Sequence, residues 1–511
     1  MEKGRQNLMK KLFKYSLQVL MAFVLAFSPL LAGTGALVQA AEDQPAASGQ
    51  VAGNDQLLDE IKKRGVIKLG VSPDYPPFEF LTREGGENKT KGIDISLAEK
   101  FADDLGVKLE IVNMEFSSLM SSLETGNIDM IISGMTYTEE RDKSVDFTKP
   151  YENAGQSLVI RKDDTDRLKD KDSFVEGTVV GVQQGSYQED LAKAHMPKAK
   201  LLTMQQVPDL LSALGTKQVD GVLVDEIMAR TATKGNDQLT YVDAKVPREE
   251  NDGKAVVIPE NQPSLGEAIN HTIDEVVEQD LVNQWADEAA DQLADTDNVD
   301  WMQYWPFFWD GIKMTLLISI LSIVFGMILG SLLAVMRISN LKFLSGIAGA
   351  YVEFVRGTPL MIQVLFIFLG VGGLLGISPL VAGLIAVSLN SGAYICEIIR
   401  GGLQSVPKGQ AEAARSLGLD YKTTLRKIIF PQSLRSIWPS LGNEFVTLIK
   451  ESSIVSTIGV AELTFQTRAV TSQTYQGIIP LFISMVIYFI ITYALTKLLN
   501  HYEKQMNAKY N

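Results

Sequence analysis

The chain has 511 residues, enough for two or three domains, and its charge is unevenly distributed. Lys and Arg number five against one acidic residue in 1–41, 26 against 51 in 42–300, and 16 against nine in 301–511, which gives net charges of +4, −25 and +7. The acidic middle section argues against nucleic acid as a partner, and the single cysteine, Cys396, excludes a disulfide framework. The last section is apolar with a basic minority, which is typical of a membrane domain in a lipid bilayer.

The first 41 residues have the pattern of a secretory signal peptide. A basic start precedes an apolar stretch over 16–38, and a short run of small residues ends at Ala41. The apolar stretch is also long enough for an uncleaved membrane anchor. Both interpretations place the acidic section outside the cytoplasm. Residues 42–55, rich in Ala, Gly, Ser and Gln, are predicted to form a flexible leader.

Short apolar strands alternate with helical segments through the acidic section. Residues 93–105 have the apolar spacing of a helix that stops at Gly106, and a second helix containing 120–123 ends at Gly126. Strands are predicted at 66–71, 109–112, 130–132, 157–161, 178–183, 200–203 and 221–225. The alternation restarts after Tyr151, which predicts two α/β lobes with parallel sheets and a ligand site beyond the carboxyl ends of the strands.

Several motifs in this section resemble those of polar amino-acid-binding proteins, which have the periplasmic type II fold. These motifs are 74–80 (DYPPFEF), 92–95 (GIDI), 133–141 (SGMTYTEER), 145–148 (VDFT), 181–186 (GVQQGS) and 224–226 (VDE). The resemblance covers residues 60–290. It implies that residues 56–295 form an extracellular domain that binds a small polar amino acid.

The resemblance also implies which residues bind the ligand's main-chain groups. Arg141 matches the residue that holds the α-carboxylate, where a guanidinium can donate two parallel hydrogen bonds. Gly134 and Thr136 match positions that support the same carboxylate. Asp225 matches the carboxylate that holds the α-ammonium. The aromatic pair matched to the ligand's aliphatic stem is Tyr75 and Phe116.

The expected pocket for the ligand's side chain departs from the family. Ser72 falls where several relatives have an aspartate that holds a side-chain nitrogen, and Gln183 falls where some glutamine binders have lysine. Ser72 and Gln183 suit a neutral amide, which favours a glutamine-like ligand. The run 185–189 (GSYQE) instead resembles relatives that bind arginine, lysine or histidine. Within it, Ser186, Tyr187 and Gln188 are expected to close the second-lobe side of the cleft.

The last section is predicted to be a permease domain over 301–505 with five membrane spans. The spans are expected at about 311–336, 351–373, 378–399, 433–458 and 477–499, each near the ~20 residues that a bilayer needs. Lys and Arg concentrate after the first span, between the third and fourth, and at the end. This distribution predicts an extracellular N-terminal domain and a cytoplasmic C-terminus in the cell membrane.

Residues 410–435 (QAEAARSLGLDYKTTLRKIIFPQSLR) form a polar, basic segment between the third and fourth predicted spans. The segment resembles the "EAA" loop of ATP-binding-cassette (ABC) import permeases. The matching residues are Glu412, Ala413, Ala414 and Gly418. The resemblance implies docking of a separate cytoplasmic ATPase subunit, which would bind ATP and Mg, and a homodimer of this chain.

Other pieces of the last section also resemble polar amino-acid permeases, and three of their polar residues fall within predicted spans. Gln363, Asn390 and Glu397 are candidate residues of the transport pathway. Gln363 and Asn390 also suit a role in holding spans together, and Glu397 is close enough to the end of its span to be interfacial.

Enzyme chemistry finds no support in the sequence. There is no G-x-x-x-x-G-K-[ST] phosphate loop, and the three histidines are scattered without a metal-ligand spacing. The chain is therefore expected to bind no cofactor itself and to act as the membrane subunit of an amino-acid importer. A ligand-gated channel would need a pore loop between the lobes, a sensor would need an output segment after residue 499, and a dehydratase of the same fold would not need the Arg141 and Asp225 pair.

Overall fold

The computed structural model describes residues 55–508 except 86, 154, 235, 248–252, 294–298 and 340. The predicted signal peptide (1–41) and residues 42–54 of the predicted leader lie outside the described residues. The described chain divides into two compact units. The lobed unit holds the residues up to Ile312 together with Ser456–Ser484, and the helical unit holds Lys313–Val455 and the residues from Met485 onward.

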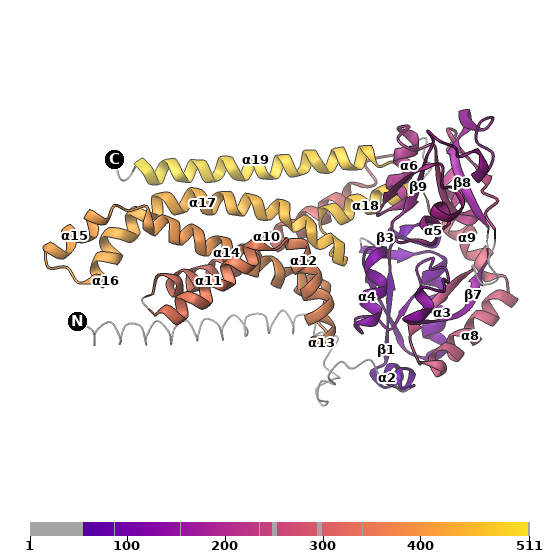
Figure 1. Ribbon diagram of the computed structural model, residues 1–511, viewed down its shortest axis with the longest axis horizontal. Helices are drawn as coiled ribbons and strands as arrows, with labels where there is room; N and C mark the ends of the chain where they lie inside the picture. Colours follow the sequence, from indigo (N-terminus) through magenta and orange to yellow (C-terminus); the bar gives the residue numbers. More distant parts are fainter. Residues whose placement is uncertain are drawn as a thin grey trace. The chain divides into compact units, whose positions relative to one another are not determined.

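The first lobe of the lobed unit is built on a five-stranded mixed sheet in the order β5-β1-β6-β13-β7 (Figure 1). β1 is parallel to β5 and β6, whereas β13 is antiparallel to β6 and β7. The strands are β1 (Val66–Val71), β5 (Lys108–Asn113), β6 (Met130–Ile131), β7 (Val145–Glu152) and β13 (Lys254–Pro259). The helices are α2 (Leu57–Arg64), α3 (Ile93–Leu105), α4 (Leu119–Glu124), α8 (Pro263–Glu278) and α9 (Leu281–Gln292), with short 3₁₀ turns η1 (Phe116–Ser118) and η2 (Arg141–Lys143).

The second lobe repeats this plan with the order β10-β9-β11-β8-β12. Its strands are β8 (Gln156–Arg161), β9 (Val179–Gln183), β10 (Lys200–Met204), β11 (Gly221–Asp225) and β12 (Leu239–Asp243). Its helices are α5 (Tyr187–His195), α6 (Val207–Gly215) and α7 (Glu226–Thr233), with 3₁₀ turns η3 (Lys162–Asp164) and η4 (Lys171–Ser173). A separate antiparallel sheet is formed by the segment between β1 and α3. Its strands are β2 (Asp74–Tyr75), β3 (Glu79–Glu84) and β4 (Glu87–Lys91).

The two predicted α/β lobes and all seven predicted strands are confirmed, but the sheets are mixed rather than parallel. The chain crosses from the first lobe to the second between β7 and β8, and returns between β12 and β13. β8 and β13, the strands that follow the two crossings, each pair antiparallel with both of their neighbours and so run against the βαβ series. β7 and β12, the strands that precede the crossings, keep the direction of the series.

Helix α18 (Leu463–Thr474) belongs to the lobed unit, although it lies within the predicted permease section. It is polar, yet ten of its twelve residues are buried, because it packs within the lobed unit. On the first lobe, Arg468 forms a 2.7 Å ion pair with Glu115 and Gln473 donates to the carbonyl of Leu81. On the second lobe, the Ser212 hydroxyl accepts a 2.7 Å hydrogen bond from the amide of Gly477, just after α18.

The helical unit is formed by α-helices with two π-helical segments. Its helices are α11 (Lys342–Gly357), α12 (Leu360–Leu365), α13 (Gly373–Leu375), α14 (Pro379–Gln404), α15 (Lys408–Ser416), α16 (Tyr421–Thr424), α17 (Phe430–Glu451) and α19 (Ile478–Ala508), with α10 (Trp305–Ile338) entering from the lobed unit. The π-helical segments are η5 (Phe366–Gly372) and η6 (Leu425–Ile429), and a 3₁₀ segment is η7 (Ser452–Ile458). α10 and α14 pack closely, since a Cβ atom at Gly330 would lie 2.7 Å from Cβ of Ile395.

Helices cover all five predicted spans, but they differ in how well they suit a membrane. Among the described residues, α10, α14 and α19 are long and apolar enough to cross one, and α11 with Leu360–Gly372 counts as a fourth if this pair, bent by 108°, is one span. The fourth predicted span corresponds to α17 and η7. Its helix carries Glu444, Lys450 and Glu451, which lower its mean hydropathy below that of a self-sufficient span.

Candidate ligand-binding site

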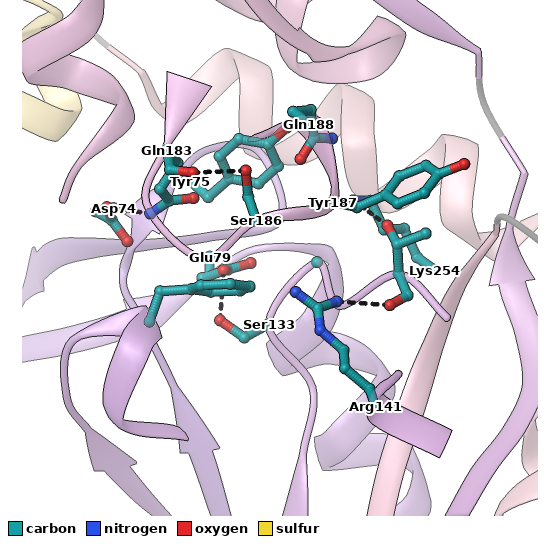
Figure 2. A pocket seen from close by; sticks show the side chains of 13 residues that line it. Asp74, Tyr75, Glu79, Ser133, Arg141, Gln183, Ser186, Tyr187, Gln188 and Lys254 are labelled. Carbon is teal, nitrogen blue, oxygen red and sulfur yellow. Dashed lines mark hydrogen bonds between the residues drawn. The ribbon is translucent and has the colours of Figure 1, made fainter. Parts of the chain in front are cut away.

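A cavity lined by residues of both lobes lies between them (Figure 2). Nine of the eleven residues predicted for the site line it. They are Tyr75, Phe116, Gly134, Thr136, Arg141, Gln183, Ser186, Tyr187 and Gln188. The other two, Ser72 and Asp225, are buried directly behind lining residues and bond to them.

Arg141 begins the 3₁₀ turn η2 and connects the two lobes. Its Nη1 donates to the carbonyl of Thr136 at 2.7 Å, and its Nη2 donates to the carbonyl of Gly185 in the second lobe at 2.8 Å. The guanidinium also lies over the ring of Phe116, 5.9 Å from its centroid. Burial lowers the pKa of Arg141 from its ordinary value, but a guanidinium remains charged in proteins. Two of its donors are therefore engaged, and three are left for an anion.

Asp225 ends β11, caps α7, and is 1% exposed. Its Oδ1 accepts from Nε2 of Gln156 at 2.7 Å. Its Oδ2 accepts from the Tyr75 hydroxyl at 2.6 Å and forms a 2.7 Å ion pair with Nζ of Lys254. Tyr75 and Lys254 belong to the first lobe, so the carboxylate joins the two lobes through a fully buried charge pair.

Asp74 and Gln183 lie on the opposite side of the cavity from Arg141 and Lys254 in Figure 2. Gln183 Nε2 donates to Oδ2 of Asp74 at 3.2 Å, and the Ser72 hydroxyl donates to Oδ1 at 2.6 Å. The Ser72 hydroxyl therefore acts on the cavity through Asp74, and the Ser72 amide donates to the hydroxyl of the lining residue Ser133 at 3.0 Å. Burial raises the pKa of Asp74 to about 7, with the Ser72 hydrogen bond opposing the shift.

Gly134 supports the site from the first lobe rather than offering a free donor. Its φ of +52° favours glycine, and a Cβ atom there would lie 3.2 Å from the Tyr75 ring. Its amide donates to Asp94 at 2.6 Å. Near Asp94, Glu79 accepts from the Ser133 hydroxyl at 2.8 Å. Burial, followed by the nearby Asp94 charge, raises the pKa of Glu79 well above its usual range.

Four lining residues were not among the predicted site residues. They are Asp74, Glu79, Ser133 and Lys254. Asp74, Glu79 and Ser133 fall inside the motifs that carry the resemblance. They would have been predicted if every polar residue of these motifs had been treated as a candidate for the site. The sequence gives only a weak indication that Lys254 belongs to the site, namely a single charged residue at the start of the apolar strand β13.

We expect Asp74→Asn to stabilise the lobed unit in a pH-dependent way. The folded-state pKa of Asp74 lies above that of the unfolded chain, so the folded form binds this proton more tightly and loses stability as pH rises from about 4 to about 7. Asparagine removes this loss. Calorimetric unfolding of the full chain in detergent should show the advantage of the variant growing by about 4 kcal/mol between pH 4 and pH 8.

The control for this prediction is Asp237→Asn, since the side chain of Asp237 is 95% exposed. Its unfolding should follow the wild type at every pH. An advantage of Asp74→Asn that is the same at pH 4 and pH 8 would show that Asp74 is not held protonated by burial.

Two of the three candidate pathway residues bond to each other in the helical unit. The Asn390 amide on α14 donates to Oε1 of Gln363 on α12 at 3.1 Å. Gln363 Nε2 in turn donates to the carbonyls of Val355 and Thr358, at 2.7 and 3.1 Å, on either side of the bend between α11 and α12. These contacts hold the bend in place, which is the structural role that was open for both residues.

Glu397 lies in a cluster of three arginines. Its carboxylate is 2.6 Å from Arg400, 3.4 Å from Arg337 and 3.7 Å from Arg356. With Arg356 it lines a second cavity, of about 660 Å³, that also involves Tyr394 and Ser440.

The EAA-like segment folds as two short helices, α15 and α16, joined at Gly418. Gly418 has a φ of +81° and its amide donates to the carbonyl of Arg415 at 2.9 Å, as in a helix C-terminal turn. Glu412 and Ala413 are exposed and Ala414 is buried. Leu417 at the turn is 82% exposed.

Comparisons with known proteins match both parts of the chain. Residues 67–288 match bacterial extracellular solute-binding proteins, family 3, and residues 322–504 match the binding-protein-dependent transport system inner membrane component. A putative glutamine transport system permease protein GlnP of Rickettsia felis is 38% identical over 202 residues, which are 39% of this chain and 93% of the relative. The arginine transport system permease protein ArtQ of Bacillus subtilis is 37% identical over 205 residues, 40% of this chain and 94% of that protein.

A solved structure similar to the lobed part is an amino acid ABC transporter substrate-binding protein from Streptococcus pneumoniae bound to L-arginine. It is 31% identical, covers 46% of this chain and 98% of its own, and has a TM-score of 0.45. The permease relatives are matched over nearly their whole length. The chain therefore belongs to the binding-protein-dependent transport system inner membrane components, as an ABC amino-acid permease that carries a family 3 solute-binding domain on the same polypeptide.

Proposed function

We propose that this membrane protein captures a polar L-amino acid between its lobes and imports it, driven by a separate ATPase subunit. The observation that carries the proposal is the division of charge in the cavity. Arg141 and Lys254, which pairs with the buried Asp225, line one side, and Asp74 with Gln183 lines the other (Figure 2). A free amino acid has a carboxylate and an ammonium at one end and its side chain at the other, which this arrangement complements.

In this proposal the α-carboxylate binds Arg141 and the α-ammonium binds Asp225. Arg141 donates to Gly185 across the cleft, Tyr75 donates to Asp225, and Gln183 donates to Asp74. Each contact joins one lobe to the other. A ligand that adds its own bonds to these groups shifts the equilibrium of the lobes towards the closed arrangement.

For the side chain, a glutamine-like ligand is the first candidate. Asp74 with a pKa of about 7 keeps its proton in a large fraction of molecules at neutral pH, and its partners Ser72 and Gln183 are neutral. A protonated carboxyl group and an amide can both donate to and accept from a ligand amide. Arginine, lysine and histidine form the second candidate class, because an ionised Asp74 is the buried carboxylate that a cationic side chain needs.

A competition assay with the full chain in detergent separates these candidates. If the ligand is glutamine-like, glutamine displaces bound amino acid at concentrations where arginine does not, and its affinity does not rise with pH. If the ligand is cationic, arginine displaces it first and binds more tightly as pH rises through about 7, because Asp74 must ionise to pair with it. The Asp74→Asn variant should then lose the pH dependence.

For transport, we propose that the ligand passes from the lobed unit to the permease helices of the same chain. The contacts of α18 with both lobes support delivery of the ligand to the chain's own permease part. The Glu397 cavity and the bend held by Gln363 and Asn390 are the places we assign to the pathway. The exposed turn at Gly418 is assigned to the ATPase, which would hold ATP and Mg, and two copies of this chain would form the transporter.

We also propose the orientation of the chain in the cell membrane. The N-terminal lobes lie outside and the C-terminus inside, since the basic residues of the last section concentrate in the segments that include 410–435. This orientation brings Glu412 and Gly418 to the side where ATP is available.

A further inference from the structure

Lys254 is a charged residue in an unusual place, the first residue of β13 at the return crossing between the lobes. Its backbone pairs with Glu152 and bridges to Thr136, which fixes it in the first lobe. Its side chain is 4% exposed and reaches Asp225 of the second lobe. A buried ammonium needs a charged partner, and Lys254 obtains it from the carboxylate assigned to the ligand.

The contacts of Lys254 belong to the ligand site itself. Its Nζ lies 2.7 Å from Oδ2 of Asp225 and 3.0 Å from the hydroxyl of Thr136, and it is 5.8 Å from the centroid of the Tyr75 ring. Thr136 also accepts from Arg141 through its carbonyl. Lys254 therefore lies at the end of the cavity that is assigned to the ligand's main-chain groups.

Both carboxylate oxygens of Asp225 already have hydrogen-bond or ion-pair partners. Oδ2 holds both Tyr75 and Lys254, and Oδ1 holds Gln156. A carboxylate carries one negative charge, which Lys254 neutralises. A second ammonium beside the same carboxylate would leave an excess positive charge in a buried site, which is strongly unfavourable.

We propose that Lys254 is a specificity-determining residue that occupies the ammonium position on Asp225, so that an amino acid binds by exchanging its α-ammonium for the ammonium of Lys254. The inference rests on the proposed function, because it takes Asp225 as the partner of the α-ammonium. It has a direct consequence for selectivity. A ligand without an α-ammonium leaves Lys254 on Asp225, so the wild type tolerates loss of that group better than a variant without the lysine.

The test measures binding by the full chain in detergent, with calorimetry. The probes are glutamine and its des-amino analogue glutaramate, and arginine and its des-amino analogue 5-guanidinopentanoate. Lys254→Met should bind the amino acid at least tenfold more tightly than the wild type. It should also raise the ratio of the Kd of the des-amino analogue to the Kd of the amino acid at least tenfold.

The controls separate competition from a structural role. Lys254→Arg keeps a cation and should keep the wild-type ratio, and Lys149→Met, on an exposed lysine of β7 that pairs with Asp274, should change neither Kd. If Lys254→Met does not give a cooperative unfolding transition, Lys254→Gln supplies the same ratio with a neutral side chain that still hydrogen-bonds.

Two outcomes overturn the inference while leaving the proposed function intact. Weaker binding of amino acid and analogue by the same factor in Lys254→Met would mean that Lys254 holds the carboxylate or the fold. An unchanged ratio would mean that Lys254 and the α-ammonium do not compete. Failure of the wild type to bind any amino acid would overturn the proposed function, and the inference with it.

Discussion

Replacement of Arg141 or Asp225 by alanine will weaken amino-acid binding by the full chain by on the order of 1.5–3 kcal/mol, or about 10- to 150-fold. Each change removes a charged hydrogen bond to one end of the ligand's main chain. Asp225→Ala should in addition destabilise the lobed unit, because it leaves Lys254 without its ion pair in a buried site. Calorimetry with glutamine and arginine measures both losses.

Matched controls for this result are Arg230→Ala and Asp237→Ala. Arg230 is exposed in the last turn of α7, and the side chain of Asp237 is 95% exposed. Both variants should bind like the wild type. The wild type should also bind the α-amide and the N-acetyl form of its amino acid more weakly than the free amino acid, since each lacks one of the two charges. Unchanged affinity in both Arg141→Ala and Asp225→Ala would mean that the amino acid does not bind in this cavity.

Gly418→Val and Glu412→Lys will abolish uptake and ligand-stimulated ATP hydrolysis while leaving ligand binding intact. A β-branched residue at a φ of +81° is strained, so valine will rearrange the turn between α15 and α16. Lysine reverses the charge of an exposed residue on the proposed docking helix. Uptake in cells and calorimetry on the purified chain give the two readouts.

Gly409→Val is the control for the turn. Gly409 lies in α15, has no positive φ, and a Cβ atom there meets no atom within 4 Å. Uptake should therefore survive this change. Full uptake in both Gly418→Val and Glu412→Lys would mean that the ATPase docks elsewhere.

The elements with a strong apolar period could be predicted from sequence. Helix α3 buries Ile93, Leu97 and Phe101 and ends at Gly106 with a φ of +68°, as its spacing indicates. Strand β4 (ENKTK) could not be found in this way, because it is polar and is held by pairing with β3. The burial of α18 likewise has no sequence signal, since Arg468 and Gln473 bond to residues of the first lobe more than 350 positions away.

The site residues that could be predicted from sequence are those that lie inside a motif, because the motif gives both the residue type and its place in the fold. Tyr75, Thr136 and Arg141 line the cavity as expected, because each lies in a motif of the first lobe. Lys254 was not predictable, because its place beside Asp225 depends on the return crossing of the chain. The role of Ser72 was also hidden, since its hydroxyl acts on the cavity through Asp74, two residues away.

The central claim is that this one chain both captures and imports an amino acid. It is tested most directly by uptake of labelled glutamine and arginine in cells that lack the chain and are complemented with the wild type, Arg141→Ala or Arg230→Ala. The account predicts that the wild type and Arg230→Ala restore uptake of one of these amino acids and that Arg141→Ala does not. Equal restoration by all three variants, or by none, would contradict it.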